Sequence, residues 1–301
     1  MSKKSSEKLS DEQAVEKIAQ YEKKEIIFGK VGIYSLIIGV PALILGMIVE
    51  SGVLAWIGAV LFVGGFVFLG LNSKMRSKSE AIVQDQLEDF YDTELQRVFG
   101  PRQHNRDMDI NQTLIRKLHP VNESWDECSE WRFYEGYYNE THFSVENVKL
   151  IDVRRDGDGY TRETVFSGAV LRCKDVCDQS LYIALRGNGT GHESDLTDPA
   201  VFRRCFTART ADDKPAADLV TPEIRELTRR IVSSSGKYTV PSLIFRSGEV
   251  VMAISNYSFG DGLLGVSNSL QNFDEIRKRF TNSLKPVCEL IEGLQDSGGD
   301  V

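Results

Sequence analysis

Histidine and cysteine side chains most often act as metal ligands, nucleophiles or proton acceptors, and this chain has few of them. The four histidines are scattered along the sequence: His104, His119, His142 and His192. None of them lies at metal-ligand spacing from another histidine or from a cysteine. His192 follows Thr190 and precedes Asp195, but this region is rich in glycine, and a catalytic triad needs rigid support. We therefore expect surface or loop histidines and no catalytic set.

The cysteines do not indicate a disulfide framework. They are Cys128, Cys173, Cys177, Cys205 and Cys288, an odd number at irregular spacing. Cys173 and Cys177 are four residues apart, but their surroundings predict a strand and a turn, and no second pair of histidines or cysteines completes a zinc set. Reduced structural thiols are the favoured interpretation.

Two short glycine-containing motifs have the composition of ligand-binding loops. Residues 187–191 (Gly-Asn-Gly-Thr-Gly) could expose backbone amides to a phosphate, but no Lys-Ser or Lys-Thr follows, so a flexible linker is the simpler interpretation. Residues 156–159 (Asp-Gly-Asp-Gly) resemble the start of a calcium loop, but Tyr160 occupies the next position that needs a ligand, and a hairpin turn fits better. The sequence thus predicts no catalytic residue, no metal and no cofactor, and it favours a protein that is not an enzyme.

Two uncharged blocks, residues 31–49 and 53–71, are each 19 residues long and contain no Asp, Glu, Lys, Arg or His. A helix needs about 20 apolar residues to cross the hydrocarbon core of a bilayer. Only Glu50, Ser51 and Gly52 separate the blocks, which predicts an antiparallel pair of transmembrane helices. A buried core helix or a cleaved signal peptide explains the pattern less well, because the blocks are adjacent and mostly polar residues precede them.

Glycines recur at seven-residue intervals in both blocks: Gly32, Gly39 and Gly46 in the first, Gly58 and Gly65 in the second. Lipid provides little hydrophobic drive between helices, so association depends on close approach of the helix backbones. We predict that these five glycines form the packing seam of the hairpin.

Basic residues flank the hairpin and indicate its orientation. They are Lys17, Lys23, Lys24 and Lys30 before the first block and Lys74, Arg76 and Lys78 after the second, and the connecting loop has none. Because Lys and Arg resist translocation, we expect a multi-pass protein of the inner or plasma membrane with both termini in the cytoplasm and the lipid bilayer as a partner. The net charge of -8 argues against a nucleic-acid partner.

The sequence as a whole predicts an α+β protein. Within a polar segment, residues 1–30, Ser10 and Gln13 form the capping box of a lead-in helix. The hairpin, residues 31–71, is followed by a juxtamembrane helix over 72–100 that ends at Gly100 and Pro101. Residues 101–295 predict a soluble domain with an antiparallel or mixed sheet packed against helices, and we expect 296–301 to be a disordered tail.

One predicted strand is unusually aromatic. A period of two places Phe133 and Tyr137 on one face and Tyr134 and Tyr138 on the other. With Phe133 as the core marker, we predict that Tyr134 and Tyr138 are the more exposed pair. Together with Trp131 they form the candidate surface for a protein partner or for self-association.

The order of several motifs resembles a known family. The motifs are residues 133–138 (Phe-Tyr-Glu-Gly-Tyr-Tyr), Phe143-Ser144 with Val148, residues 164–168 (Thr-Val-Phe-Ser-Gly), Asp198-Pro199, residues 219–222 (Leu-Val-Thr-Pro) and residues 242–245 (Ser-Leu-Ile-Phe). Their order resembles a bacterial membrane-anchored family, domain of unknown function 3137. The resemblance implies two N-terminal membrane helices followed by the same succession of strands and helices, and it implies no activity. This chain lacks the extended polar and aromatic ending associated with that family.

Two classes of function fit these features. The first is an interaction, scaffold or sensor module that displays a cytoplasmic α+β domain from a membrane anchor. The alternative is a membrane-tethered enzyme or ligand-binding protein whose site is assembled from residues distant in the sequence. A channel or transporter fits less well, because neither apolar block carries a charge.

Overall fold

The computed structural model describes residues 9–103, 108–121, 124–157, 159–177, 182–187, 195–260 and 272–295. Five predictions lie wholly or partly outside these residues: the first eight residues of the segment 1–30, the tail 296–301, most of the loop 187–191, one residue of the turn 156–159, and His104 with His192. The chain forms two compact units, Met1–Asp92 with Leu263–Lys278, and Thr93–Gly262 with Arg279–Val301. The helices α2 and α6 contribute to both units.

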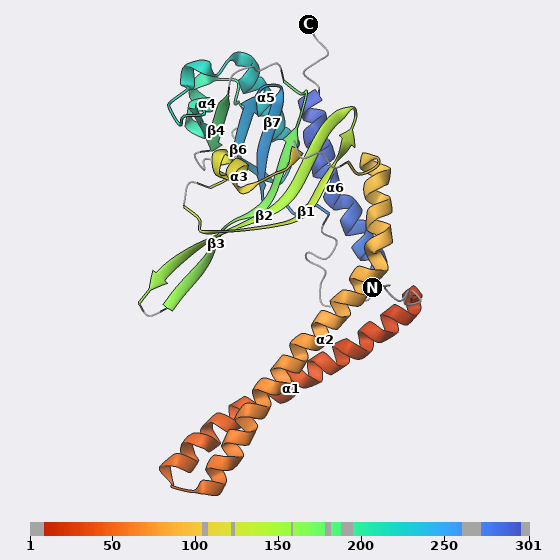
Figure 1. Cartoon of the computed structure of the whole chain (residues 1–301), viewed down its shortest axis with the longest axis vertical. Coiled ribbons are helices and arrows are strands. Elements are labelled where there is room, and N and C mark those ends of the chain that lie inside the picture. Colours follow the sequence, from red (N-terminus) through yellow and green to blue (C-terminus); the bar gives the residue numbers. More distant parts are fainter. Residues whose placement is uncertain are drawn as a thin grey trace. The chain divides into compact units, whose positions relative to one another are not determined.

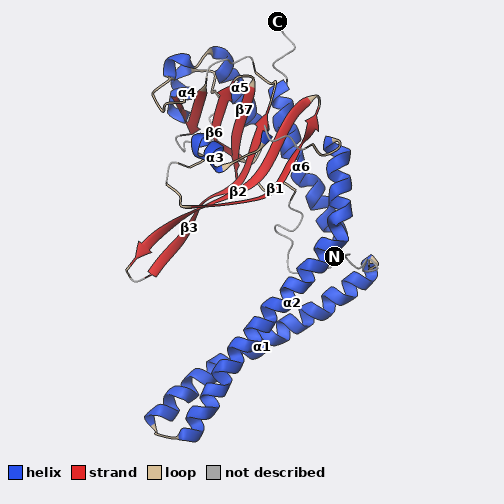
Figure 2. Cartoon of the chain, in the orientation of Figure 1, coloured by secondary structure: helices blue, strands red, loops and turns tan. Residues whose placement is uncertain are grey.

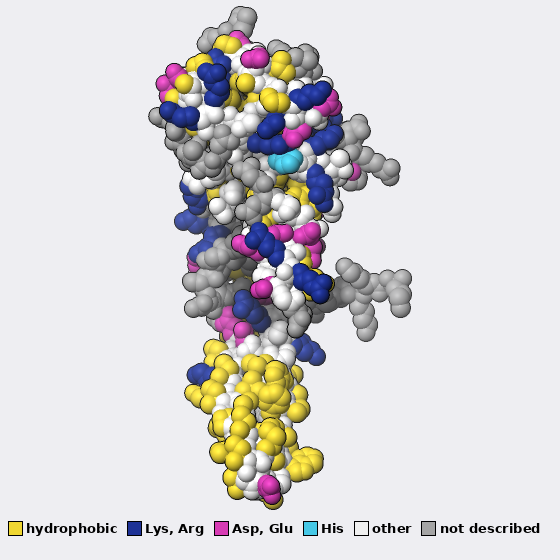
Figure 3. Space-filling view, turned by 90° about the vertical axis from the view of Figure 1, so that its left-hand side faces the viewer, with side chains coloured by type: hydrophobic (Ala, Val, Ile, Leu, Met, Phe, Trp, Pro, Cys, Tyr) yellow, Lys and Arg dark blue, Asp and Glu magenta, His cyan; other side chains and the backbone are white. Residues whose placement is uncertain are grey.

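The first unit contains a hairpin of two long helices, α1 (Asp11–Ile48) and the first part of α2 (Gly52–Phe99). Ser10 and Gln13 form the predicted capping box, and the lead-in helix continues into the first apolar block without a break. Figure 1 shows the two helices side by side and antiparallel. Both are long and apolar enough to cross a membrane, and within their most apolar 18-residue windows only 17% and 11% of residues are buried. The outward apolar surface, visible in Figure 3, is not that of a core helix.

The predicted glycine seam lies where the two helices touch. A Cβ added at Gly39 would lie 2.9 Å from the backbone nitrogen of Phe62, and one at Gly46 would lie 2.4 Å from that of Ala55. A Cβ added at Gly58 would lie 2.4 Å from the backbone nitrogen of Leu43. Gly32 and Gly65 face each other, since an added Cβ on either would lie 3.1 Å from the other's carbonyl oxygen. At Gly39, Gly46 and Gly58 a side chain would therefore collide with the facing backbone, and at Gly32 and Gly65 it would be tightly crowded.

At the charged end of the hairpin, a small apolar cluster joins three helices. It comprises Ala14 and Ile18 of α1, Val83 and Leu87 of α2, and Phe273 and Ile276 of α6 (Phe273–Gln295). Around it the Arg277 guanidinium lies 3.0 Å from the Asp11 carboxylate. The Gln86 amide donates to the Leu9 carbonyl at 2.9 Å. The beginning of the last helix is thus held against the beginning of the first.

The second unit is built on one seven-stranded sheet. The strands are β1 (Glu127–Tyr138), β2 (Thr141–Asp156), β3 (Gly159–Cys173), β4 (Ile183–Gly187), β5 (Phe206–Arg209), β6 (Thr239–Arg246) and β7 (Glu249–Ser255). Their order is β1-β2-β3-β7-β6-β4-β5, and every neighbouring pair is antiparallel. The part of β2 after Ile151 and the part of β3 before Thr164 pair only with each other. They extend from the sheet as a two-stranded ribbon (Figure 2). The predicted α+β fold is confirmed, and its sheet is wholly antiparallel.

Helices cover both faces of this sheet. On one face, α3 (Gln112–Leu118) buries Leu114, Ile115 and Leu118 against Val148, Leu150 and residues of β3, β4, β6 and β7. On the other, Phe99 at the end of α2 packs against Phe143 with ring centroids 4.9 Å apart, and Tyr138 donates to Glu292 of α6 at 2.6 Å. Three further helices complete the unit: α4 (Pro199–Cys205), η2 (Ala217–Leu219) and α5 (Pro222–Ser234). Sequence periodicity did not predict α3, because seven residues are too few to show a helical period.

The predicted exposure of the aromatic strand is wrong, and a β-bulge is the reason. Trp131 pairs with Asn147 and Tyr134 with Val145, so Arg132 and Phe133 together oppose a single residue of β2. Arg132 has φ +58°, as the extra residue of a bulge often does. The extra residue reverses the alternation beyond it, so Tyr134 is buried at 4% exposure, Tyr138 is half-buried and Tyr137 is exposed at 49%.

We expect Gly39→Leu to destabilise the hairpin by about 1–3 kcal/mol, because the new side chain meets the backbone of α2. Leucine has the higher helix propensity, so any loss must come from the helix contact. Gly64→Leu is the matched control, since nothing lies within 4 Å of a Cβ at Gly64. Thermal unfolding in detergent micelles measures both, and equal melting temperatures for the two variants would contradict a close-packed seam.

Candidate functional site

One face of the sheet carries a set of polar side chains at the end of several neighbouring strands. We call this set the polar row; it comprises Glu135, His142, Ser144, Arg172, Lys174, Arg246 and Glu249. Strand register brings the members together: Glu135 opposes Ser144, Ser144 opposes Arg172, and Arg246 opposes Glu249. Directly opposed residues share a face, so side chains from five strands meet there.

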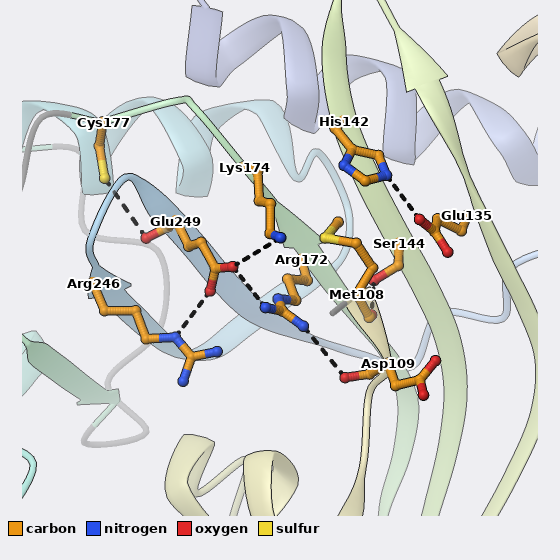
Figure 4. A network of polar contacts seen from close by, with 10 residues as sticks. All are labelled: Met108, Asp109, Glu135, His142, Ser144, Arg172, Lys174, Cys177, Arg246 and Glu249. Atoms are coloured by element: carbon orange, nitrogen blue, oxygen red, sulfur yellow. Dashed lines mark hydrogen bonds and ion pairs between the residues drawn. The ribbon is translucent and has the colours of Figure 1, made fainter. Parts of the chain in front are cut away.

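Glu249 is the centre of the polar row (Figure 4). Its carboxylate lies 2.6 Å from the Arg172 guanidinium, 2.9 Å from that of Arg246 and 4.0 Å from the Lys174 ammonium. Burial raises the pKa of Glu249, but the hydrogen bond and charge of Arg172, with those of Arg246, outweigh it and hold the pKa below its ordinary value. The thiol of Cys177 donates to the Glu249 carbonyl at 3.6 Å. The carboxylate thus links three strands.

At the other end of the row, Glu135 is completely buried and pairs with a histidine. Its Oε1 lies 2.8 Å from Nε2 of His142, whose ring stacks on Tyr137 at 4.7 Å between centroids. The hydroxyl of Ser144 is buried and donates to the Met108 carbonyl at 2.7 Å, so it is not presented to a substrate. The contacts of the polar row therefore cross-link strands and hold the segment 108–110 on the sheet, and they do not form a nucleophile with its base.

Three of the thiols are poorly suited to nucleophilic attack. None of the five cysteines forms a disulfide. Burial raises the pKa of Cys128 to about 12, with Glu130 adding to the rise, and burial raises that of Cys288 to about 11. Burial also raises the pKa of Cys173. These three groups remain thiols at neutral pH, as expected for structural cysteines.

A further carboxyl group, on β2, has a raised pKa. Burial raises the pKa of Glu146 to about 7, and the nearby carboxylates of Glu130 and Asp109 add to the rise. Among the described residues, no group of three or more His, Cys, Asp or Glu side chains could hold a metal ion. Glu146 therefore titrates near neutral pH without a metal site around it.

The opposite face of the same unit is hollowed by an open cleft of about 1070 Å³. Its floor is apolar and includes Ile224 and Leu227 of α5, Phe245 of β6 and Leu294 of α6. The rim is formed by the β1–β2 turn, by residues 175–177 after β3 and by the first turns of α5. A cavity of this size with an apolar floor and a polar rim suits a drug-sized ligand or a short peptide.

Local sequence positions each wall of the cleft. Thr221 accepts a hydrogen bond from the Ile224 amide and Pro222 occupies the first helical position, so α5 begins at the rim. A Thr-Pro pair of this kind is a local sequence signal for the start of a helix. The Gln295 amide donates to the Thr141 hydroxyl at 2.8 Å and fixes the end of α6 to the β1–β2 turn. Phe245 reaches the floor because alternate residues of β6 point to opposite faces.

The rim of the cleft is acidic. Glu140, Asp175, Glu223 and Glu226 face one cation, Arg230. Glu226 is already committed to Arg229 at 2.5 Å and to Arg230 at 3.6 Å. Within the described part of the chain, the carboxylates of Glu140 and Asp175 have no hydrogen-bond or ion-pair partner. The cleft therefore offers uncommitted negative charge beside an apolar floor.

The structure separates the candidate partner surface from this cleft. Tyr134 donates to the Gly100 carbonyl at 2.9 Å and packs among Phe99, Phe143 and Phe259. Tyr138 is held by Glu292, and Trp131 is half-buried. The side chains of Tyr134 and Tyr138 are thus engaged within the unit. Sequence reasoning missed the cleft because its walls come from five separate segments, and only the helix start at Thr221 gave a signal.

No protein-family model, no curated protein and no solved structure matches this chain. The resemblance to domain of unknown function 3137 stays a prediction.

We expect Glu146→Gln to stabilise the protein at pH 8 and to leave its stability nearly unchanged at pH 5. The pKa of Glu146 is raised from 4.5 to about 7 in the folded state. The stability that Glu146 contributes to the fold is therefore fully present below pH 4.5 and is lost as the pH rises through 7. A neutral amide avoids this loss, which we put at roughly 1–2 kcal/mol for a half-buried group.

Melting temperatures of the full chain at both pH values provide the measurement. Glu163→Gln, on the exposed part of β3, is the control and should show no pH-dependent gain. Equal behaviour of the two variants at pH 8 would refute the raised pKa.

Proposed function

We propose that this protein is a membrane-anchored interaction module. In this proposal the two-helix hairpin spans the bilayer, both termini lie in the cytoplasm, and the α+β domain offers its cleft to a partner protein.

The outward apolar surface of the hairpin supports the anchor. The most exposed large apolar side chains of the chain include Ile48, Val53 and Trp56, at 71%, 74% and 72% exposure. Water would make such a surface costly, at about 25 cal/mol per Å² of apolar area, whereas lipid accommodates it. The charge-free seam of glycines suits helix packing in lipid.

The distribution of basic residues supports the orientation. Lys24 and Lys30 precede the apolar part of α1, and Lys74 and Arg76 follow that of α2, while the loop between the helices has no Lys or Arg. Positive charge near the ends of a span is retained on the cytoplasmic side.

The single observation that carries the interaction role is the cleft itself. It combines a large apolar-floored cavity with carboxylates that no described residue neutralises. The polar row lacks the exposed nucleophile and paired base that would favour chemistry over binding.

The orientation is tested with a membrane-impermeant maleimide on intact cells that express Ser51→Cys. Position 51 lies in the loop between the helices and should react from outside, whereas the five native cysteines of the parent chain should react only after lysis in denaturant, because all of them are buried or half-buried. Cysteines introduced at Ser5 and Ser297 should behave like the native ones. Labelling of the parent chain in intact cells would contradict the proposed orientation.

The interaction role is tested by photo-crosslinking in living cells. We expect benzoylphenylalanine in place of Val176, a half-buried residue of the cleft, to give discrete protein adducts. The same group in place of Tyr160, which is 75% exposed on the ribbon outside the cleft, is the matched control. Absence of adducts at position 176, or identical adducts at both positions, would remove the support for a cleft partner.

A further inference from the structure

The cleft has two chemical features that together restrict its occupant. Buried apolar side chains form its floor, and four carboxylates against one guanidinium form its rim. An anionic ligand would meet net repulsion there. A small cation would satisfy the rim but leave the apolar floor of a cleft of about 1070 Å³ in contact with water.

The uncommitted carboxylates both lie near the end of the β2–β3 ladder. Phe143 pairs with Cys173, and the Lys174 amide donates to the His142 carbonyl at 2.9 Å, two residues after Glu140 in the β1–β2 turn. At Asp175 the backbone turns away from the ladder, with φ +57°, and the Val176 amide donates to the Gly248 carbonyl at 3.1 Å. Glu140 and Asp175 therefore both line the cleft close to the His142–Lys174 contact, and we call this pair the acidic corner.

The other two acids are less available. Glu226 forms a two-point contact with Arg229, which lowers the pKa of Glu226. Glu223 interacts with the Thr221 hydroxyl at the start of α5, and this interaction lowers the pKa of Glu223. Both stay ionised and add to the negative electrostatic potential of the cleft. The acidic corner of Glu140 and Asp175 is where a new cation would find unpaired oxygens.

From this arrangement we infer that the cleft binds a peptide segment of a partner protein in which Lys or Arg alternates with apolar residues. The apolar side chains cover the floor of Ile224, Leu227, Phe245 and Leu294, and a basic side chain pairs with Glu140 and Asp175. This inference rests on the proposed function, since it names the chemistry of the partner.

The test uses the full chain in nanodiscs of zwitterionic phosphatidylcholine and three fluorescein-labelled octapeptides. The first is Lys-Leu-Lys-Phe-Lys-Leu-Lys-Gly, the second replaces each Lys by Glu, and the third replaces Leu and Phe by Ser. Fluorescence anisotropy, corrected with empty nanodiscs, should show the first peptide binding at least about tenfold more tightly than either of the others. Equal affinity for the acidic or the serine peptide would overturn the inference.

Variants locate the binding. The double variant Glu140→Gln with Asp175→Asn should weaken the first peptide about tenfold, because it removes both unpaired charges. Asp156→Asn with Glu163→Gln makes the same charge change on the exposed ribbon and should leave the affinity unchanged. Val176→Ala should weaken binding about threefold by removing half-buried apolar contact. A loss of affinity equal for both double variants would mean nonspecific attraction and would refute the site.

Two other occupants are distinguished in the same experiment. Spermine that binds as tightly as the first peptide would show that charge alone suffices. If the chain dimerises in detergent and the double variant at Glu140 and Asp175 does not, a second copy of the chain is the occupant. Either result would refute a peptide as the occupant of the cleft. Crosslinks at position 176 in cells without a preference for the basic peptide would refute this inference and leave the proposed function standing.

Discussion

The backbones of α1 and α2 approach each other so closely that a side chain at Gly39, Gly46 or Gly58 would collide with the facing helix. In the proposed bilayer, burial of apolar area between the helices would supply little energy, and dispersion contacts between the closely packed helices would have to supply it. The hairpin in turn presents Ala14, Ile18, Val83 and Leu87 together at its charged end. This surface accepts the beginning of α6, so the last helix of the chain depends on the geometry of the first two.

In the sheet unit, the corresponding constraint is strand register. Antiparallel pairing places polar residues of neighbouring strands directly opposite one another, and the polar row satisfies nearly buried charges with each other. Removing one member of a buried pair such as Arg172 and Glu249 leaves an uncompensated charge, which typically costs about 3–5 kcal/mol. A slip of one residue would break several of these contacts at once, so the row specifies the register more than it adds stability.

The same sheet presents different chemistry on its two faces. On one face the charges are paired, and the one serine hydroxyl of the polar row is buried, which is the pattern of a structural network. On the other, the β1–β2 turn, the start of α5 and the end of α6 surround an open cleft with carboxylates left unpaired. The proposed binding role rests on this second face of the sheet.

Local sequence determined the elements whose signals are local. The two uncharged blocks, the seven-residue glycine spacing, the capping box at Ser10 and the helix start at Thr221 each follow from interactions within a few residues, and the structure has all of them. The α+β class also followed from the change in hydrophobic period along the chain.

Only the tertiary structure decided which aromatic residues are exposed and where the cleft lies. A period of two assumes an uninterrupted strand, and the bulge at Arg132, which follows from pairing with β2, reverses the faces beyond it. The cleft joins segments up to 156 residues apart, from Asn139 to Gln295, and no pattern along the chain encodes their proximity. Side-chain identity fixes what each residue can do, but the long-range packing of strands and helices decides which residues do it together.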